Sequence, residues 1–336
     1  PTSRQDFGYN TDFHWLYFAL TSPEKSDLML EIEYANLDYV ELFEVKNGKI
    51  TPLGLSGDRF QFRQRPYTNN NYVFPIRLQA GEKAQYFLML DQPHAILSFF
   101  IKLWHRSDFL RIDREEYMLW GIYVGIICIV MIMNLVMLLA TKDWIYLWYS
   151  LYLHFMTMHL FSDAGLGFQY LWSDFPKINA YAPVYLYVWA AMIAQTTFMQ
   201  YFIQQTRRNS RVFWWINAFK IMVAMALVAA IGIPLFEVKG REEYMYKIVS
   251  QTTSYLVPII VVLTVISLYE RRHEREQLVR YYGYALIVQF LGYSTVAFIN
   301  FCQTQGWALP FDVETYVIIG LTVLLDIVFF TYGLAH

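Results

Sequence analysis

The stretch MLWGIYVGIICIVMIMNLVMLLA, residues 118–140, contains no charged side chain from end to end. A helix needs about 20 apolar residues to cross a hydrocarbon core roughly 30 Å thick. Six further stretches of similar length and polarity follow it. The seven predicted spans are 118–140, 144–165, 178–203, 212–236, 244–269, 280–302 and 313–336. The sequence therefore predicts an all-α bundle of seven transmembrane helices over residues 118–336.

Residues 1–103 are polar and alternate between apolar and polar side chains in short runs, as antiparallel strands do. Asn47-Gly48 is a strong hairpin turn, and a second turn is expected at Ala80-Gly81-Glu82. The predicted strands are 13–20, 27–35, 38–45, 71–78, 84–90 and 95–103. We expect an all-β sandwich of about seven strands over 1–103, with its first strand or two lying before Pro1. Residues 104–117 (WHRSDFLRIDREEY) predict a connector that forms a short helix at the lipid headgroups.

Composition supports a multi-domain membrane protein. Hydrophobic residues make up 56% of the 336 residues and charged residues only 16%, against roughly 25% charged in soluble domains. Both cysteines, Cys128 and Cys302, fall inside apolar spans, which excludes a disulfide framework or a Cys-rich metal site. No cofactor or metal is expected. The start lacks a signal peptide, and we expect a processed N-terminus ahead of Pro1.

Loop charges predict the orientation, because Lys and Arg near span ends favour the cytoplasmic side. One set of loops carries Lys142, Arg207, Arg208, Arg211, Arg271, Arg272, Arg275 and Arg280. The opposite set carries Lys177, Lys239, Arg241 and Lys247. We therefore expect the N-terminal domain outside and His336 at the cytoplasmic face. The same charge bias explains the arginine runs, so no nucleic-acid partner is expected.

Several motifs resemble one known family. They are FGY at 7–9, FHWLYF at 13–18, LDYVEL at 37–42, GDRFQF at 57–62, YVFP at 72–75, GIYVG at 121–125 and YLWYSLY at 146–152. In order and spacing the chain resembles the bacterial seven-transmembrane receptors with diverse intracellular signalling modules, with their type 2 extracellular domain. Residue Tyr17 departs from the pattern, since the family commonly has an Arg there. The resemblance implies a jelly-roll-like sandwich related to carbohydrate-binding modules, in the bacterial inner membrane.

A small-molecule or glycan site is predicted on the sandwich, because sugar rings need an aromatic face, and their hydroxyl groups need amide and guanidinium partners. The candidate ligand-binding residues are Trp15, Arg63, Arg65, Tyr67, Asn69, Asn70 and Asn71. The alternative is that Trp15 belongs to the core and that the Asn run is only a polar loop.

Polar residues within the spans form a second candidate site, because charge at membrane depth is costly. We expect His154, Lys220 and Asp326 to form a polar cluster that couples outer binding to movement of the seventh helix. The alternative is that they snorkel or hydrogen-bond neighbouring helices as packing contacts. We expect deep aromatic residues such as Tyr152 and Trp189 to have one of two roles. They either line an apolar cavity for a lipid-like ligand or pack the helices together.

These features favour a signalling receptor. The sandwich would bind a ligand, and the helices would relay the change to the cytoplasm. We expect the output there to come either from a module beyond His336 or from a partner protein. A homodimer is expected, because output modules of the family commonly work as dimers. No Walker loop, nucleophile elbow or His-Glu-x-x-His motif occurs, so the segment is not expected to be an enzyme. Two alternatives stay open: a transporter or channel, and a non-enzymatic scaffold of an envelope assembly.

Overall fold

The computed structural model describes residues 2–8, 12–92, 97–181, 183–232, 241–273, 275–304 and 315–334. The chain divides into two compact units. Unit 1 comprises Pro1–Gly121, Phe161–Pro183 and Glu237–Lys247, and unit 2 comprises Ile122–Leu160, Val184–Phe236 and Ile248–His336. Four helices, described below, contribute residues to both units.

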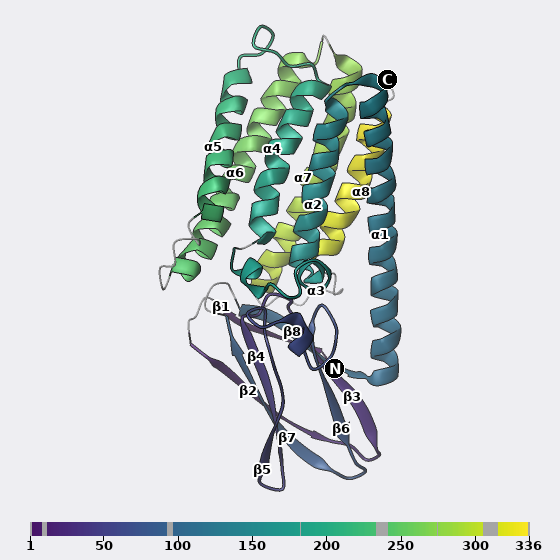
Figure 1. Ribbon diagram of the computed structural model, residues 1–336, viewed down its shortest axis with the longest axis vertical. Coiled ribbons are helices and arrows are strands. Elements are labelled where there is room, and N and C mark those ends of the chain that lie inside the picture. The colour runs from purple at the N-terminus through teal and green to yellow at the C-terminus, as the bar shows by residue number, and fades with distance from the viewer. Residues whose placement is uncertain are drawn as a thin grey trace. The chain divides into compact units, whose positions relative to one another are not determined.

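Unit 1 contains a sandwich of two four-stranded antiparallel sheets (Figure 1). One sheet has the order β1-β8-β3-β6 and the other β2-β7-β4-β5. The strands are β1 (Thr2–Gly8), β2 (His14–Thr21), β3 (Ser26–Glu33), β4 (Tyr39–Lys46), β5 (Lys49–Ser56), β6 (Tyr72–Leu78), β7 (Lys83–Asp91) and β8 (Leu97–His105). This eight-stranded order is that of a jelly roll, so the predicted sandwich is confirmed.

Period-two burial builds the sandwich core. Along β2, side chains alternate between partly buried and exposed positions, and Leu16, Phe18 and Leu20 pack on the core. The most buried side chains of the sandwich core include Ile32, Val40, Leu42, Phe74, Leu88 and Leu90. Burying each such side chain contributes about 1.5–3 kcal/mol, which makes this interleaved layer the main source of the sandwich's stability.

Two strands lie where the sequence did not indicate them. Strand β1 lies after Pro1, and β5 follows the hairpin at Asn47-Gly48, whose φ angles of 51° and 76° confirm the predicted turn. Strand β5 is an edge strand that contains Pro52 and an irregular register near Leu42 of β4. Pro and a register shift both weaken the alternation by which strands are predicted.

The expected connector at 104–117 is not a separate helix. Trp104 and His105 end β8, and α1 (Arg106–Thr141) is one continuous helix of 36 residues. Within unit 1, its first turns cover the outer face of one sheet, where Phe109 packs with Met29 of β3 and Val73 of β6. Consequently β3 is buried on both faces from Leu28 to Ile32.

Unit 1 also includes the segment 161–183. This segment, hereafter the docking segment, contains the end of α2 (Ile145–Asp163), α3 (Leu166–Tyr170) and η2 (Pro176–Tyr181). The Phe62 backbone N–H donates to the Ser173 carbonyl at 3.1 Å, and the Asn179 side chain donates to the Asp58 carbonyl at 2.9 Å. These bonds attach the docking segment to the loop between β5 and β6.

Unit 2 is helical. Besides α1 and α2 it contains α4 (Pro183–Phe202), α5 (Phe213–Gly232), α6 (Arg241–Arg271), α7 (Glu276–Thr304) and α8 (Thr315–Leu334). These seven long helices follow the seven predicted spans in order. Among the described residues, five helices are long and apolar enough to cross a membrane, namely α1, α5, α6, α7 and α8. Helices α2 and α4 have the length, but Tyr, His, Thr and Gln side chains lower their mean hydropathy.

A glycine at the start of the loop after β5 has no room for a side chain. A Cβ added to Gly57 (φ 152°) would lie 2.1 Å from the Asp38 carbonyl oxygen, whereas Gly81 (φ 74°) has nothing within 4 Å. We predict that Gly81→Ala lowers the free energy of unfolding by about 1–2 kcal/mol through backbone strain alone. Gly57→Ala should cost at least about 1 kcal/mol more, because the backbone must also move. Thermal unfolding of the full chain, followed by circular dichroism, measures both losses, and equal losses would contradict the prediction.

Candidate functional site

The predicted ligand-binding residues do not form one site. Trp15 lies on β2, with its side chain on the exposed face of its sheet. Arg63 lies on the short helix η1 (Phe62–Gln64), is exposed, and donates through Nε to Gln61 Oε1 at 2.8 Å. Arg65 is buried in the loop after η1. The structure therefore places Trp15 on a strand of the sandwich and the two arginines in the loop between β5 and β6, so the predicted combination of these side chains is not formed.

Arg65 organises the loop that follows it. One guanidinium nitrogen, Nη1, lies within hydrogen-bond distance of three consecutive carbonyl oxygens, those of Asn69 at 2.8 Å, Asn70 at 2.8 Å and Asn71 at 3.1 Å, so its two N–H groups are shared among three acceptors. The guanidinium also stacks on the Tyr72 ring at 4.3 Å. Burial lowers the pKa of Arg65, and only 8% of the residue is exposed. A buried guanidinium with these bonds is a structural anchor.

The three Asn side chains form a junction inside unit 1, hereafter the Asn junction. Asn69 donates to Asp113 of α1 at 2.6 Å, and Asn71 donates to Glu31 of β3 at 3.0 Å. Asn70 donates to the carbonyl of Ala164, in the docking segment, at 3.0 Å. All three are buried, so the structure favours the alternative reading of a structural loop for this run. Tyr67 is likewise partly buried, with its ring against Phe109 at 5.6 Å.

The outer face of the β2-β7-β4-β5 sheet carries a set of aromatic rings, hereafter the aromatic face. Its members are Phe13, Trp15, Tyr17, Tyr39, Phe43 and Phe87. Phe13, Trp15 and Tyr17 are each 55–57% exposed, which is unusual for such large apolar side chains. The strand register aligns Tyr17, Phe87 and Phe43 across three neighbouring strands. Trp15 stacks on Phe43, with ring centroids 6.0 Å apart.

Polar groups accompany these rings. The Tyr39 hydroxyl donates to the Glu41 carboxylate, and Glu41 lies across Met89 from Trp15 in the register. Burial and this hydrogen bond raise the pKa of Tyr39 to about 12, so the phenol stays a donor at neutral pH. The sequence pattern indicates this face, although the predicted site included only Trp15 from it. In FHWLYF, positions 13, 15 and 17 are aromatic and project to one side of a strand.

The three intramembrane residues that were expected to cluster are not brought together. The Lys220 ammonium of α5 donates to Gln200 Oε1 of α4 at 2.6 Å. His154 is exposed, with its ring beside Phe155. Asp326 of α8 is fully buried. The helical period explains the separation, because His154 lies about 200° around α2 from Tyr152, the residue that does reach Asp326.

Asp326 instead belongs to a network of neutral donors, hereafter the polar network. Its Oδ2 accepts from the Tyr152 hydroxyl of α2 at 2.9 Å and from Gln289 Nε2 of α7 at 2.6 Å. Gln195 of α4 donates to Gln289 Oε1 at 2.8 Å. Helices α2, α7 and α8 thus meet at one carboxylate, and α4 joins them through Gln289. Polar contacts of this kind hold membrane helices together.

A buried carboxylate pair lies in unit 1 beside the docking segment. Asp58 and Asp38 are both buried, and Arg59 binds Asp38 Oδ2 at 3.1 Å. Burial, reinforced by the neighbouring Asp38, raises the pKa of Asp58 well above its ordinary value, while the charge of Arg59 opposes the rise. Among the residues that the structure describes, no three His, Cys, Asp or Glu side chains are grouped to hold a metal ion.

The raised pKa of Asp58 predicts a pH dependence. Below the ordinary pKa of 3.8, the Asp58 carboxyl is protonated in both the folded and the unfolded chain, and its contribution to stability is fully present. This contribution to the free energy of unfolding is lost as the pH rises through the pKa of the folded chain. Between the two pKa values the free energy of unfolding should fall by about 1.4 kcal/mol per pH unit. Asp58→Asn should remove this fall and be more stable than the unmodified protein at pH 8. Thermal unfolding across pH measures it, and the exposed Asp174→Asn serves as a control. A pH slope that survives in Asp58→Asn would contradict the assignment.

Comparison with known families agrees with both parts of the fold. The family described as 7TMR-DISM extracellular 2 matches residues 1–105. The family described as 7TM diverse intracellular signalling matches residues 116–336. No curated protein matches the chain. The second family covers well over half of the chain, so the chain belongs to the seven-transmembrane receptors with diverse intracellular signalling and carries their type 2 extracellular domain.

Proposed function

We propose that the aromatic face binds an oligosaccharide, and that the helices relay binding to a cytoplasmic output module or partner protein. The observation that carries the proposal is the exposed set of rings on the outer face of the β2-β7-β4-β5 sheet. The equivalent face of the other sheet is covered by the first turns of α1. A contiguous exposed apolar patch on a soluble domain marks a binding site. Family membership supplies the wider role, a membrane signalling receptor.

The chemistry of this face suits a flat sugar ring. A ring with equatorial hydroxyls presents axial C–H groups, which pack on aromatic rings, and its edge presents hydroxyl groups. Trp15 and Tyr17, two residues apart on β2, present neighbouring rings for consecutive sugar units. The Glu41 carboxylate lies in the same row as Trp15 and can accept hydrogen bonds from hydroxyls. A β-linked glucan fits these requirements.

The proposed relay follows helix α2. The docking segment is attached to the sandwich through Asn70 and Asp58, and it contains the last residues of α2. Helix α2 continues into unit 2, where its Tyr152 donates to Asp326 of α8. A displacement of the loop between β5 and β6 would therefore be transmitted along α2 to the polar network. With the N-terminal domain outside, α8 would end at the cytoplasmic side, as the loop charges predict.

Trp15→Ala tests the ligand site. We predict that it weakens binding of cellopentaose at least fivefold, because truncating a central aromatic contact costs about 1 kcal/mol or more. Calorimetric titration of the full chain in lipid nanodiscs measures the affinity. Arg63→Ala, an exposed change away from the aromatic face, should bind as the unmodified protein does. Equal binding by Trp15→Ala, with unchanged thermal unfolding, would contradict the site.

Asp326→Asn tests the relay separately. Asn keeps the size but removes the charge that strengthens the bonds from Tyr152 and Gln289. We predict unchanged cellopentaose affinity and loss of about half or more of the conformational response. A bimane label at Tyr332→Cys, in a background with both native cysteines changed to Ser, reports the response, because Tyr281 of α7 lies beside position 332 and quenches the dye. Thr295→Val is the matched control, because the Thr295 hydroxyl donates to the Leu291 carbonyl of its own helix at 2.8 Å. A full response in Asp326→Asn would remove the polar network from the relay.

A further inference from the structure

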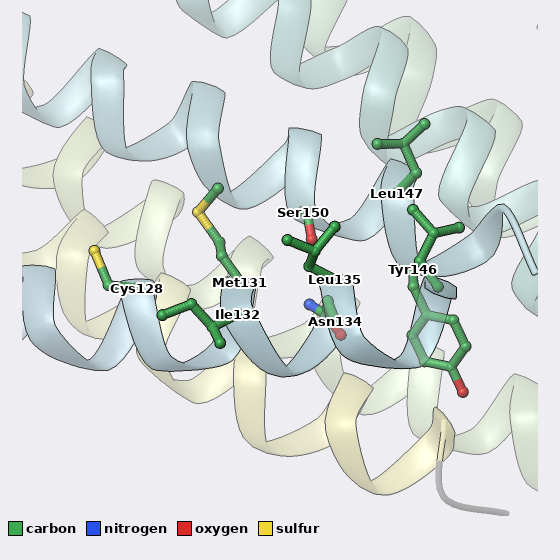
Figure 2. Close-up of a pocket in the computed structure, with 9 residues that line it drawn as sticks. Cys128, Met131, Ile132, Asn134, Leu135, Tyr146, Leu147 and Ser150 are labelled. Atoms are coloured by element: carbon green, nitrogen blue, oxygen red, sulfur yellow. The ribbon is translucent and has the colours of Figure 1, made fainter. Parts of the chain in front are cut away.

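We propose that a groove between α1 and α2 binds a lipid-soluble carbonyl compound, at a site separate from the aromatic face. The groove has a volume of about 380 Å³ and belongs entirely to unit 2. This volume lies within the range of about 300–1,000 Å³ that is typical of small-molecule sites. Figure 2 shows side chains of both helices lining it, with the polar ends of Asn134 and Ser150 among apolar neighbours.

The lining suits an apolar molecule. Its surface is almost wholly apolar, and Met131 and Leu135 of α1 and Leu147 of α2 are among the residues that line it. Ile132 and Leu135 are 61% and 54% exposed, so the groove opens on a surface of α1 that lies at membrane depth. An apolar chain can therefore enter from the hydrocarbon layer without crossing water.

Asn134 indicates the polar group of the ligand. Only 7% of this residue is exposed, yet its Nδ2 has no hydrogen-bond acceptor in the described part of the chain. An unpaired amide in a medium without water costs free energy that a bound acceptor recovers. Since Nδ2 donates, the complementary group is an acceptor such as a carbonyl oxygen. The groove thus combines an apolar channel with the unused donor of Asn134.

The depth of Asn134 separates this ligand from ordinary bilayer lipids. Asn134 lies seven residues before Thr141, where α1 ends, which corresponds to about 10 Å along the helix. Ester carbonyls of bilayer lipids remain near the headgroups, outside a hydrocarbon core about 30 Å thick. A carbonyl that reaches Asn134 must lie within the hydrocarbon layer. A long-chain ketone has this arrangement.

The test compares 9-heptadecanone with heptadecane, which has nearly the same shape but no acceptor. Radiolabelled forms of both are bound to the full chain in phosphatidylcholine nanodiscs, with empty nanodiscs subtracted. We expect the ketone to bind about two- to tenfold more tightly than the alkane, as one hydrogen bond supplies. Asn134→Leu should abolish this preference while keeping or raising the thermal unfolding temperature, since it removes an unpaired amide.

Two further variants control the result. Asn217→Leu removes an amide on α5 that already bonds the Phe213 carbonyl at 2.8 Å, and it should leave the ketone preference intact. Ser150→Phe should fill the groove and weaken both probes. The proposal is overturned if Asn134→Leu keeps the ketone preference, or if Ser150→Phe leaves binding unchanged. It is also overturned if neither probe binds above partition into empty nanodiscs, the outcome expected if a second copy of the chain occupies the groove.

Discussion

The hydrogen bonds from Arg65 to three consecutive carbonyls support much of unit 1. By holding the backbone of residues 69–71, Arg65 directs three neighbouring amides toward α1, the docking segment and β3. A hydrogen bond that involves a charged group contributes about 1.5–3 kcal/mol by itself. Their shared origin makes them cooperative, because losing the guanidinium would leave the three carbonyls unsatisfied and would release the backbone that positions the three amides. The position of the loop, and with it the docking segment, depends on one buried cation.

This arrangement gives the two sheets different environments. The β1-β8-β3-β6 sheet is covered outside by Phe109 and its neighbours, and Met29 and Val73 of that face are buried. The β2-β7-β4-β5 sheet keeps its outer face open, and its aromatic side chains remain exposed. Because apolar area is costly in water, a free protein has no structural reason to keep Trp15 and Tyr17 there. The asymmetry itself favours a binding role for the open face.

Local periodicity predicted most elements, and it failed where tertiary context decides. The alternation of residues 13–20 and 84–90 located β2 and β7 to within about a residue, and seven long helices follow the seven predicted spans. Alternation shows which side chains share a face, but not what covers that face. It therefore could not show that Asn70 would bond Ala164, some ninety residues away, or that Tyr152 rather than His154 would reach Asp326. Residue type suggested ligand binding for Arg65, whereas burial made it structural.

The same reasoning explains why α2 and α4 fall short of the hydropathy of a membrane span, whereas the other five long helices contain a stretch that reaches it. Their polar side chains face other helices of unit 2, as Tyr152 and Gln195 do in the polar network. A side chain satisfied inside a bundle need not be apolar, whereas one that faces lipid must be. Low mean hydropathy in a long helix of this kind therefore marks a helix surrounded by protein contacts. Tyr152 of α2 bonds Asp326 directly, and Gln195 of α4 is joined to it through Gln289 of α7. Both helices are therefore placed to take part in a relay.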